Sequence, residues 1–306
     1  MEDMDYNVVS VSGGKDSTAV LLLALERNAP NLKAVFADTG NEHPITYDYL
    51  EYLDKKVHPI TIVKADFTED LNRRSDYIQN HWLEEGKSQY EIDKAVEALK
   101  PTGNPFLDLC LYKGRFPSPR AAFCTKMLKK EVIDQQVFSP LLTEGYDVNS
   151  WVGVRADESP RRAALKVSEF AKDLKGSKLW IYRPVLKWTA QDCFNLHKKH
   201  GIEPNPLYKM GMSRVGCMPC MQCRKTELLE ISKRFPEEFE RIKNWEERVS
   251  NASKRGSATF FPAKADELGK YPKIDTVISN LKYKQSYEFQ EELFEPMCSS
   301  VYGLCE

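Results

Sequence analysis

The sequence carries almost no net charge. Its 44 Lys and Arg residues are offset by 45 Asp and Glu residues, and the formal net charge is −1 at pH 7. A strongly basic chain would point to nucleic acid as its main partner, and this balance gives no such indication. Local basic patches are still compatible with it, so overall charge selects no partner class, and a nucleic-acid acceptor stays a candidate.

Long apolar runs and a secretory leader are also lacking. No apolar stretch approaches the ~18–20 residues that span a bilayer. The first residues, MEDMDYNVVS, do not place a basic segment before an apolar one, as a signal peptide does. We therefore expect a cytoplasmic protein without membrane contact. Its 306 residues suggest one large or two ordinary domains, and 42% hydrophobic residues suffice for a core.

Histidine is scarce, with five residues, and no H-x-x-x-H pair with a nearby acid occurs. A histidine metal centre is therefore not expected, and we expect His197 and His200 at the surface of one helix. Cysteine is more abundant, with eight residues. In a reducing cytosol, clustered cysteines indicate a metal or redox site rather than a disulfide framework.

The order of apolar runs predicts a doubly wound α/β fold. Strands and helices alternate at the start of the chain, which predicts a mostly parallel sheet with helices on both faces. Five strands are expected, over residues 6–12, 32–40, 58–66, 150–155 and 178–185, with helices over 16–28, 44–56, 121–137 and 189–201. The chain beyond is charged and mostly helical. We therefore expect an α/β domain over residues 1–225 and a helical C-terminal region over 226–306.

A glycine loop joins the first strand to the first helix, which Asp16 or Ser17 could cap. It reads Ser12-Gly13-Gly14-Lys15-Asp16-Ser17. Glycines let backbone amides approach a phosphate, and a helix N-terminus adds unpaired donors and partial positive charge. Lys15 adds a full charge, and two serines add hydroxyl donors. The spacing fits neither the Walker loop nor G-x-G-x-x-G. A turn with purely conformational glycines is the alternative; the position after the first strand favours an anion site.

The run SVSGGKDS resembles the PP-loop of the N-type ATP pyrophosphatases. That superfamily includes tRNA-thiolating enzymes, amide-forming synthetases and the PAPS/APS reductases. The resemblance implies that ATP is cut between its α and β phosphates while the loop holds pyrophosphate. Lys15 and the amides of Gly13 and Gly14 would then stabilise the leaving pyrophosphate. Asp16 would orient the loop or help to hold Mg²⁺.

Three further stretches resemble the PAPS/APS reductase branch, and the resemblance covers about residues 5–225. They are FADTGNEHPIT, GVRADESPRRA and a segment over 182–220 that contains W-T-x-x-D, NPLY and GCxxC. Arginine forks suit phosphate or sulfate oxygens, although a solvated helix start is the commoner fate of such a run. The resemblance implies a nucleotide site with Asp38, Thr39, Gly153 and Arg155, and a phosphate or sulfate site with Arg161 and Arg162. Lys126 and Lys129, on an otherwise solvated basic helix, are further candidates to meet phosphate.

The cysteines Cys217, Cys220 and Cys223 form C-x-x-C-x-x-C. This spacing can ligate three irons of one [4Fe–4S] cluster. Cys124 is the candidate fourth ligand, because iron–sulfur members of the reductase family carry a tandem Cys-Cys at about this place. Phe123 stands at the first of these two positions, so that either Cys223 replaces the missing ligand or one iron stays open. Zinc held by four thiolates, and no metal at all, are the alternatives.

Three functions follow as candidates. The first is an ATP pyrophosphatase that adenylates an acceptor and supports sulfur transfer from a cluster or a cysteine persulfide. The second is an assimilatory PAPS or APS reductase, and the third is a nucleotide-binding module without turnover. The intact loop favours the first, since the reductases tend to have a degraded loop without the lysine. Cys305, in GLCE, has the position of their C-terminal nucleophile without its Glu-Cys-Gly-Leu-His motif. A cysteine desulfurase, a thioredoxin-like donor and a second copy of the chain are candidate partners.

Overall fold

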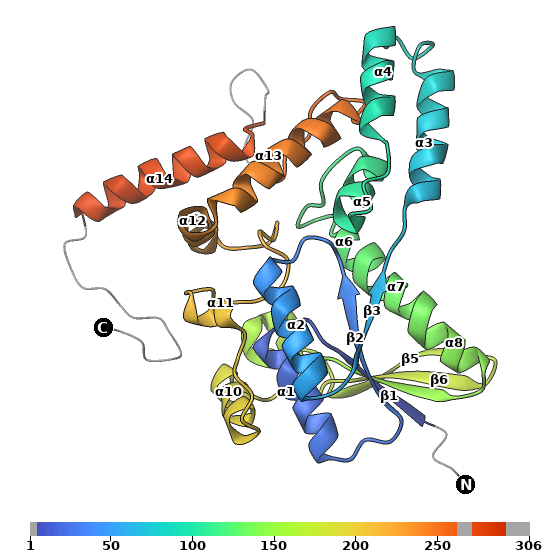
Figure 1. Ribbon diagram of the computed structural model, residues 1–306, viewed down its shortest axis with the longest axis vertical. Helices are drawn as coiled ribbons and strands as arrows, with labels where there is room; N and C mark the ends of the chain where they lie inside the picture. The colour runs from blue at the N-terminus through green and yellow to red at the C-terminus, as the bar shows by residue number, and fades with distance from the viewer. Residues whose placement is uncertain (1–4, 262–270, 292–306) are drawn as a thin grey trace.

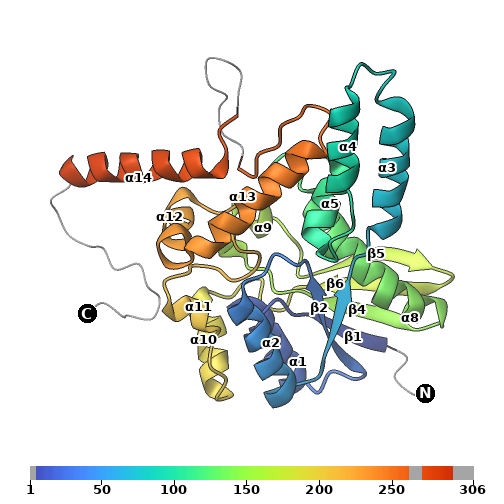
Figure 2. The same ribbon diagram turned by 45° about the horizontal axis from the view of Figure 1, so that its top comes forward.

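A computed structural model describes residues 5–261 and 271–291, with the backbone alone for residues 284–291. A twisted sheet lies between two layers of helices, and further helices pack beside one end of it (Figure 1). The second view shows these further helices standing on the side of the sheet where the strands β1 and β2 end (Figure 2).

The sheet has six strands in the order β3-β2-β1-β4-β6-β5. Neighbouring strands from β3 to β6 run parallel, which confirms the expected mostly parallel sheet. In the register, Val9 of β1 stands opposite Ala34 of β2 and Trp151 of β4. The strands are β1 (Asp5–Ser10), β2 (Leu32–Asp38), β3 (Ile60–Lys64), β4 (Asp147–Trp151), β5 (Ser168–Leu174) and β6 (Ser177–Tyr182).

The strand β5 is one more than the five expected from the sequence. It pairs antiparallel with β6 at the edge of the sheet. Its sequence, SEFAKDL, mixes charged and apolar residues, and most of its side chains are at least partly exposed. An edge strand of this kind lacks the apolar run that marks the buried strands. Lys175 and Gly176, both with positive φ, form the tight turn to β6.

Each face of the sheet is covered by its own helices. The helices α1 (Lys15–Glu26), α2 (Pro44–Lys56) and α10 (Ala190–Lys199) cover one face, in a core that includes Val9 and Phe36. The stretch that contains α7 (Glu131–Ile133) and α8 (Ser139–Thr143) covers the other, against Val8 and Val35. Successive residues of β1 thus bury opposite faces, which explains the unbroken apolar run of a parallel strand.

The second layer is one helical stretch from Phe123 to Thr143. It starts with α6 (Phe123–Thr125) and continues through α7 and α8, with π-helical turns at Lys126–Lys130 and Asp134–Phe138. Turns of this type are rare and are found frequently at functional sites. The first of them carries three lysines toward the carboxyl ends of the central strands.

Six longer helices form a third group. They are α3 (Thr68–His81), α4 (Gln89–Ala98), α5 (Pro105–Lys113), α12 (Lys225–Arg234), α13 (Pro236–Asn251) and α14 (Ile274–Glu291). Helices from before and after residue 225 share one apolar cluster, in which Phe106 stacks on Trp245 with ring centroids 5.6 Å apart. The helical character expected of the C-terminal part is confirmed over residues 226–261 and 271–291, whereas the domain boundary at residue 225 stays a prediction.

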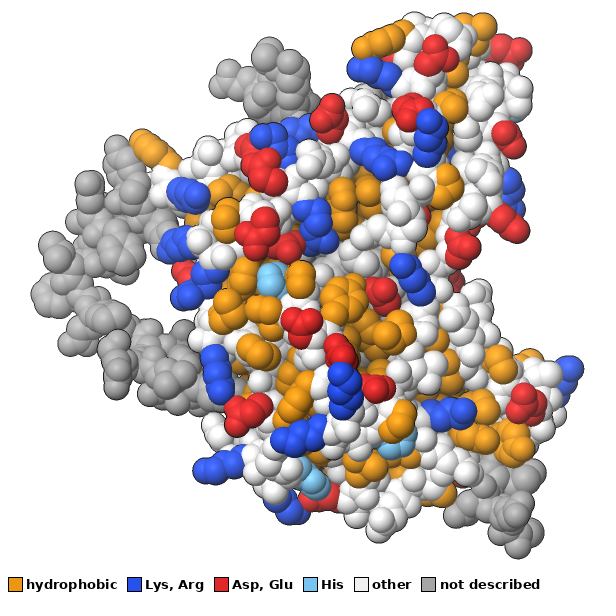
Figure 3. Space-filling view, in the orientation of Figure 1, with side chains coloured by type: hydrophobic (Ala, Val, Ile, Leu, Met, Phe, Trp, Pro, Cys, Tyr) orange, Lys and Arg blue, Asp and Glu red, His pale blue; other side chains and the backbone are white. Residues whose placement is uncertain are grey.

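Charged side chains of both signs are interspersed over the face shown in Figure 3, in keeping with the nearly neutral sequence. No helix in the described ranges is long and apolar enough to cross a membrane.

Candidate functional site

The glycine loop lies between β1 and α1. Gly13 has φ +72°, and a Cβ added there would lie 3.0 Å from Cγ2 of Thr46, so that both conformation and space favour glycine. Ser17 folds the loop on itself: its hydroxyl accepts a hydrogen bond from the Ser12 amide at 3.0 Å and donates to the Gly14 carbonyl at 3.0 Å.

The start of α1 differs from the sequence-based expectation that Asp16 or Ser17 caps the helix. The helix begins at Lys15 with Gly14 in the cap position, and no side chain caps it, because the Ser17 hydroxyl bonds within the loop. Among the described residues, none accepts a hydrogen bond from the Gly13 or Gly14 amide. These amides and the helix N-terminus therefore offer donors to an anion.

The charged residues of the loop form a buried network. The ammonium of Lys15 lies 3.2 Å from Oδ2 of Asp16, and Oδ1 of Asp16 lies 2.8 Å from Nε of Arg155. Arg155 also pairs with Asp157 at 2.7 Å. Only about a tenth of the Lys15 side chain is exposed. Asp16 is thus shared by two cations, which suits a residue that orients the loop.

The segment after β4 packs directly on the loop. A Cβ on Gly153 would lie 2.8 Å from both the Ser17 amide nitrogen and the Asp16 carbonyl carbon. Glycine at this position therefore permits a close approach of two backbones, and it brings Arg155 to Asp16. The structure joins these sequence-predicted residues in one site.

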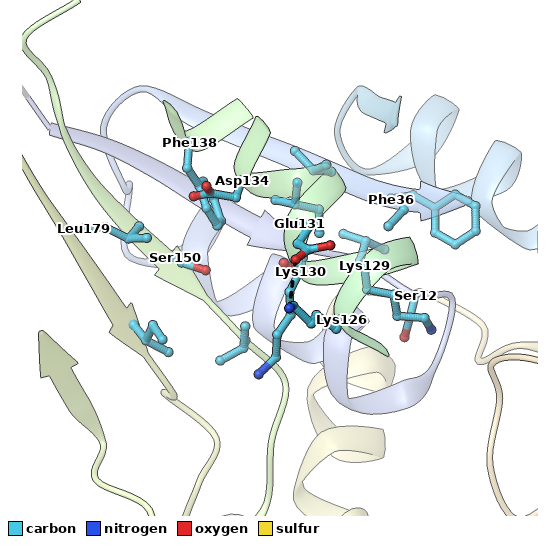
Figure 4. Close-up of a pocket in the computed structure, with 17 residues that line it drawn as sticks. Ser12, Phe36, Lys126, Lys129, Lys130, Glu131, Asp134, Phe138, Ser150 and Leu179 are labelled. Carbon is cyan, nitrogen blue, oxygen red and sulfur yellow. Dashed lines mark ion pairs between the residues drawn. The ribbon is translucent and has the colours of Figure 1, made fainter. Parts of the chain in front are cut away.

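A cavity of about 570 Å³ opens beside the loop, at the carboxyl ends of β1, β2 and β4. Figure 4 shows Phe138 and Leu179 among its walls, and Lys126, Lys129 and Ser12 grouped toward its other end. Here the strand order reverses between β1 and β4, which is where open α/β sheets bind ligands. Apolar walls with lysines at one end suit a ligand that has a flat ring and an anionic tail.

Asp38 is the last residue of β2 and Thr39 follows it, but neither lines this cavity. Asp38 accepts hydrogen bonds from the Tyr47 hydroxyl at 2.7 Å and the Gly40 amide at 2.8 Å. Burial and the Asp38 hydrogen bond raise the pKa of Tyr47 above its ordinary value, which keeps this phenol protonated. The Thr39 hydroxyl donates to Glu42 at 2.8 Å. The two predicted residues therefore shape the turn after β2.

The turn after β2 holds the cysteine loop, residues 217–223. Glu42 and Cys217 form a backbone bridge, and the Met218 amide donates to the Asn41 carbonyl at 2.7 Å. The Cys217 sulfur lies 3.5 Å from the Thr39 hydroxyl oxygen and donates to Oε1 of Glu42 at 3.6 Å. The cysteine loop is thereby fixed beside the sheet ends.

Three partly buried thiols of this region, Cys124, Cys217 and Cys223, have raised pKa values, which favours their protonated form. Burial raises the pKa of Cys217 and of Cys223 to about 12, and it also raises the pKa of Cys124. Lys129, which lines the cavity, opposes the shift of Cys217 through its charge. Over residues 5–261 and 271–283, whose side chains are described, no three Cys, His, Asp or Glu side chains gather as a metal-binding group. The predicted ligand set of Cys124, Cys217, Cys220 and Cys223 is thus not assembled here, and Cys305 lies outside the described residues.

The arginines Arg161 and Arg162 lie on α9 (Pro160–Ala163) and are exposed. Arg162 forms an ion pair with Glu158, and neither arginine lines the cavity. Their contact with phosphate or sulfate stays a prediction.

Sequence reasoning missed three residues that contact the glycine loop. Tyr208 accepts a hydrogen bond from the Lys15 amide at 2.9 Å, and Asn205 donates to the Gly13 carbonyl at 3.2 Å. His197 was expected at the surface, and this is wrong: it is 1% exposed, and its Nε2 donates to the Lys15 carbonyl at 2.8 Å. Asn205 and Tyr208 belong to the NPLY motif of the sequence, but only the folded chain shows that this motif faces the glycine loop.

A glycine loop with open amides, placed where the strand order of a doubly wound sheet reverses, is the arrangement of an α/β protein of the PP-loop class. The family described as phosphoadenosine phosphosulfate reductase domain matches residues 6–223. The chain belongs to this family, within the PP-loop superfamily.

Several known proteins are similar to the chain. It is 46% identical to an uncharacterized 37.8 kDa protein in the gpa 5′ region of Escherichia phage 186, over 98% of this chain and 96% of that protein. It is 26% identical to an adenosine 5′-phosphosulfate reductase of Geobacillus kaustophilus, over 66% of this chain and 67% of that one. The chain is also similar to the crystal structure of the phosphoadenylyl-sulfate reductase of Candida auris. The match covers 70% of this chain and 80% of that one, with 18% identity and a TM-score of 0.40.

Proposed function

We propose that the protein is an ATP pyrophosphatase that adenylates an acceptor and supports its sulfuration. The observation that carries the proposal is the loop itself: the amides of Gly13 and Gly14 are open, and Lys15 stands at the start of α1. A reaction that releases pyrophosphate needs such a group of donors, whereas one without this leaving group does not.

The first step is nucleotidyl transfer. An acceptor oxygen attacks the α-phosphorus of ATP, the bond between the α and β phosphates breaks, and pyrophosphate leaves with its magnesium ion. Fixed donors stabilise the negative charge that grows on the leaving group. Lys15 and the two glycine amides would supply this stabilisation, while the ion pair between Asp16 and Arg155 keeps the loop in place.

The adenosine would occupy the cavity beside the loop. Its apolar walls, including Phe138 and Leu179, suit the purine ring, and Lys126 and Lys129 suit the phosphates. The cavity runs along the strand ends to Ser12, the first residue of the loop. Base and triphosphate tail can therefore be held at the same time.

The second step brings sulfur to the adenylated acceptor. The cysteine loop is close to the glycine loop, since a Cβ on Gly14 would lie 3.5 Å from the Val215 carbonyl oxygen. A cysteine persulfide, filled by a desulfurase-type donor, attacks the acceptor atom that carries the adenylated oxygen, and AMP leaves with that oxygen as the new sulfur bond forms. A second thiol then cleaves the sulfur–sulfur bond, sulfur stays on the acceptor, and a thioredoxin-like donor reduces the resulting disulfide.

A [4Fe–4S] cluster or a zinc ion is not used in this scheme. The described cysteines do not form a cage around one metal, so we assign no step to a metal held by them. The cluster stays a prediction from the C-x-x-C-x-x-C spacing. Iron and sulfide analysis of anaerobically purified protein tests it, together with the broad absorbance near ~400 nm that such clusters show.

Reduction of adenylated sulfate is the second candidate function. The similarity to a protein named adenosine 5′-phosphosulfate reductase favours it. The intact lysine loop is the observation against it, since no pyrophosphate leaves in that reaction.

Exchange of labelled pyrophosphate into ATP separates the candidates. Exchange that depends on an added acceptor supports the proposal. Thioredoxin-dependent reduction of adenylated sulfate without exchange supports the second function. Nucleotide binding without either activity would contradict both and leave a binding module.

A further inference from the structure

Lys15 is held at its backbone as well as at its side chain. It is the first residue of α1, and its amide has no acceptor within the helix. The Tyr208 hydroxyl, 193 positions away in sequence, accepts a hydrogen bond from that amide at 2.9 Å. On the other side, the Lys15 carbonyl accepts from His197 at 2.8 Å. Both peptide groups of this lysine are therefore fixed by side chains from α10 and from α11 (Pro206–Lys209).

Tyr208 is itself a firm anchor. Its ring packs edge to face on Phe194 with centroids 5.5 Å apart, and the residue is 8% exposed. Asn205 starts the short helix α11 by accepting from the Leu207 amide at 3.0 Å, and it donates to the Gly13 carbonyl at 3.2 Å. The turn that carries Tyr208 is thus attached to the glycine loop at two points.

The same tyrosine sets the direction of the Lys15 side chain. The ammonium lies 5.5 Å from the centroid of the Tyr208 ring and 3.2 Å from Oδ2 of Asp16. A cation over an aromatic face is attracted by the ring, and more so when water is excluded. Ring and carboxylate together hold the ammonium beside the loop.

We propose that Tyr208 is a positioning residue for the anionic tail of the nucleotide. Its hydroxyl accepts a hydrogen bond from the Lys15 amide, the first amide of α1, and so fixes the glycine loop. In this conformation the Gly13 and Gly14 amides and the Lys15 ammonium would face the same anion. Its hydroxyl acts through Lys15 and needs no contact with the ligand. This inference rests on the proposed function, because it assumes that the loop holds pyrophosphate.

Calorimetric titration of the full chain with inorganic pyrophosphate, ATP and adenosine tests the proposal. Tyr208→Phe keeps the ring and removes only the hydroxyl. Loss of one acceptor that fixes a buried donor predicts an affinity about 5- to 30-fold lower for pyrophosphate and ATP. The affinity for adenosine should stay within about twofold, since it would not touch the loop. Tyr52→Phe, on the surface of α2, is the matched control and should change none of the three affinities.

The outcomes are distinct. Equal weakening of all three ligands by Tyr208→Phe would show a merely structural tyrosine and overturn the inference, as would unchanged pyrophosphate affinity. Wild-type protein that binds no pyrophosphate would overturn the proposed function and this inference with it. The second variant, Tyr208→Met, lacks both the hydroxyl and the ring. Its affinity for pyrophosphate and ATP should fall at least as much as that of Tyr208→Phe. Melting temperatures of all variants identify any that fail to fold.

Discussion

Gly153 and Ser17 are in backbone contact: a Cβ on the glycine would lie 2.8 Å from the serine amide nitrogen. The contact joins the end of β4 to the first turn of α1 and aligns Arg155 with Asp16. Two segments that are more than 130 positions apart thus form one candidate site, and they can approach this closely because glycine has no side chain.

Replacement of Gly153 by alanine should therefore separate these backbones. We expect unfolding free energy to fall by about 1–3 kcal/mol, the usual cost of overpacking, because neither backbone can yield easily. Pyrophosphate affinity should fall with it. Urea unfolding followed by circular dichroism measures the first effect, and Val154→Ala, in the same segment, is the control. Unchanged stability of Gly153→Ala would show that the close contact is absent in solution.

Replacement of Lys15 by alanine removes the full charge of the loop. Because this charge would face the leaving pyrophosphate in the proposed reaction, we expect ATP–pyrophosphate exchange to fall by a factor of about 10² or more. The fold should persist, since Asp16 keeps its pair with Arg155. Lys178→Ala, on the exposed side of β6, should leave exchange unchanged. A fully active Lys15→Ala would show that the loop has been assigned wrongly.

The pair of Asp16 and Arg155 should be coupled in stability. Asp16→Asn leaves the buried guanidinium with Asp157 alone, and breaking a buried pair from one side is costly, about 2–4 kcal/mol here. The double variant with Arg155→Met should recover part of this loss, because no unpaired charge remains buried. A double-mutant cycle measures the coupling. Additive losses would mean that the two side chains do not interact.

Much of this site is readable in the sequence. The glycines, Lys15 and the strand before them predict the loop, because the backbone freedom and the charge that an anion needs are local properties. Val8 and Val9 are both buried, on opposite faces of the sheet, as expected of a strand that is covered on both faces. Confirmation of the parallel sheet shows how far such local patterns reach.

Other parts depend on contacts that no local pattern reveals. His197 reaches the loop because α10 packs on α1, and Tyr208 reaches it because α11 packs on α2. In the sequence, a histidine among charged residues of a helix is typical of a surface. The edge strand β5 lacks an apolar run, since its side chains are largely solvated and its pairing with β6 is what orders it.

The buried imidazole of His197 predicts a pH dependence of stability. Burial lowers its pKa below the model-compound value of 6.5, so the folded protein keeps it neutral while the unfolded chain protonates it. Its contribution is therefore present in full above pH 6.5 and is lost as the pH falls toward the lowered value. His197→Gln, which can still donate to the Lys15 carbonyl, should show a smaller loss of stability between neutral and acidic pH. Equal pH slopes for both proteins, measured by urea unfolding, would contradict this.

The central claim is that the Gly13 and Gly14 amides bind the β and γ phosphates of ATP. Nuclear magnetic resonance of protein labelled with ¹⁵N only at its 15 glycines tests it directly. Titration with ATP or inorganic pyrophosphate should shift the amide signals of these two glycines, identified by Gly→Ala variants, whereas adenosine should leave them in place. Signals that respond to adenosine alone, or to none of these ligands, would contradict the account.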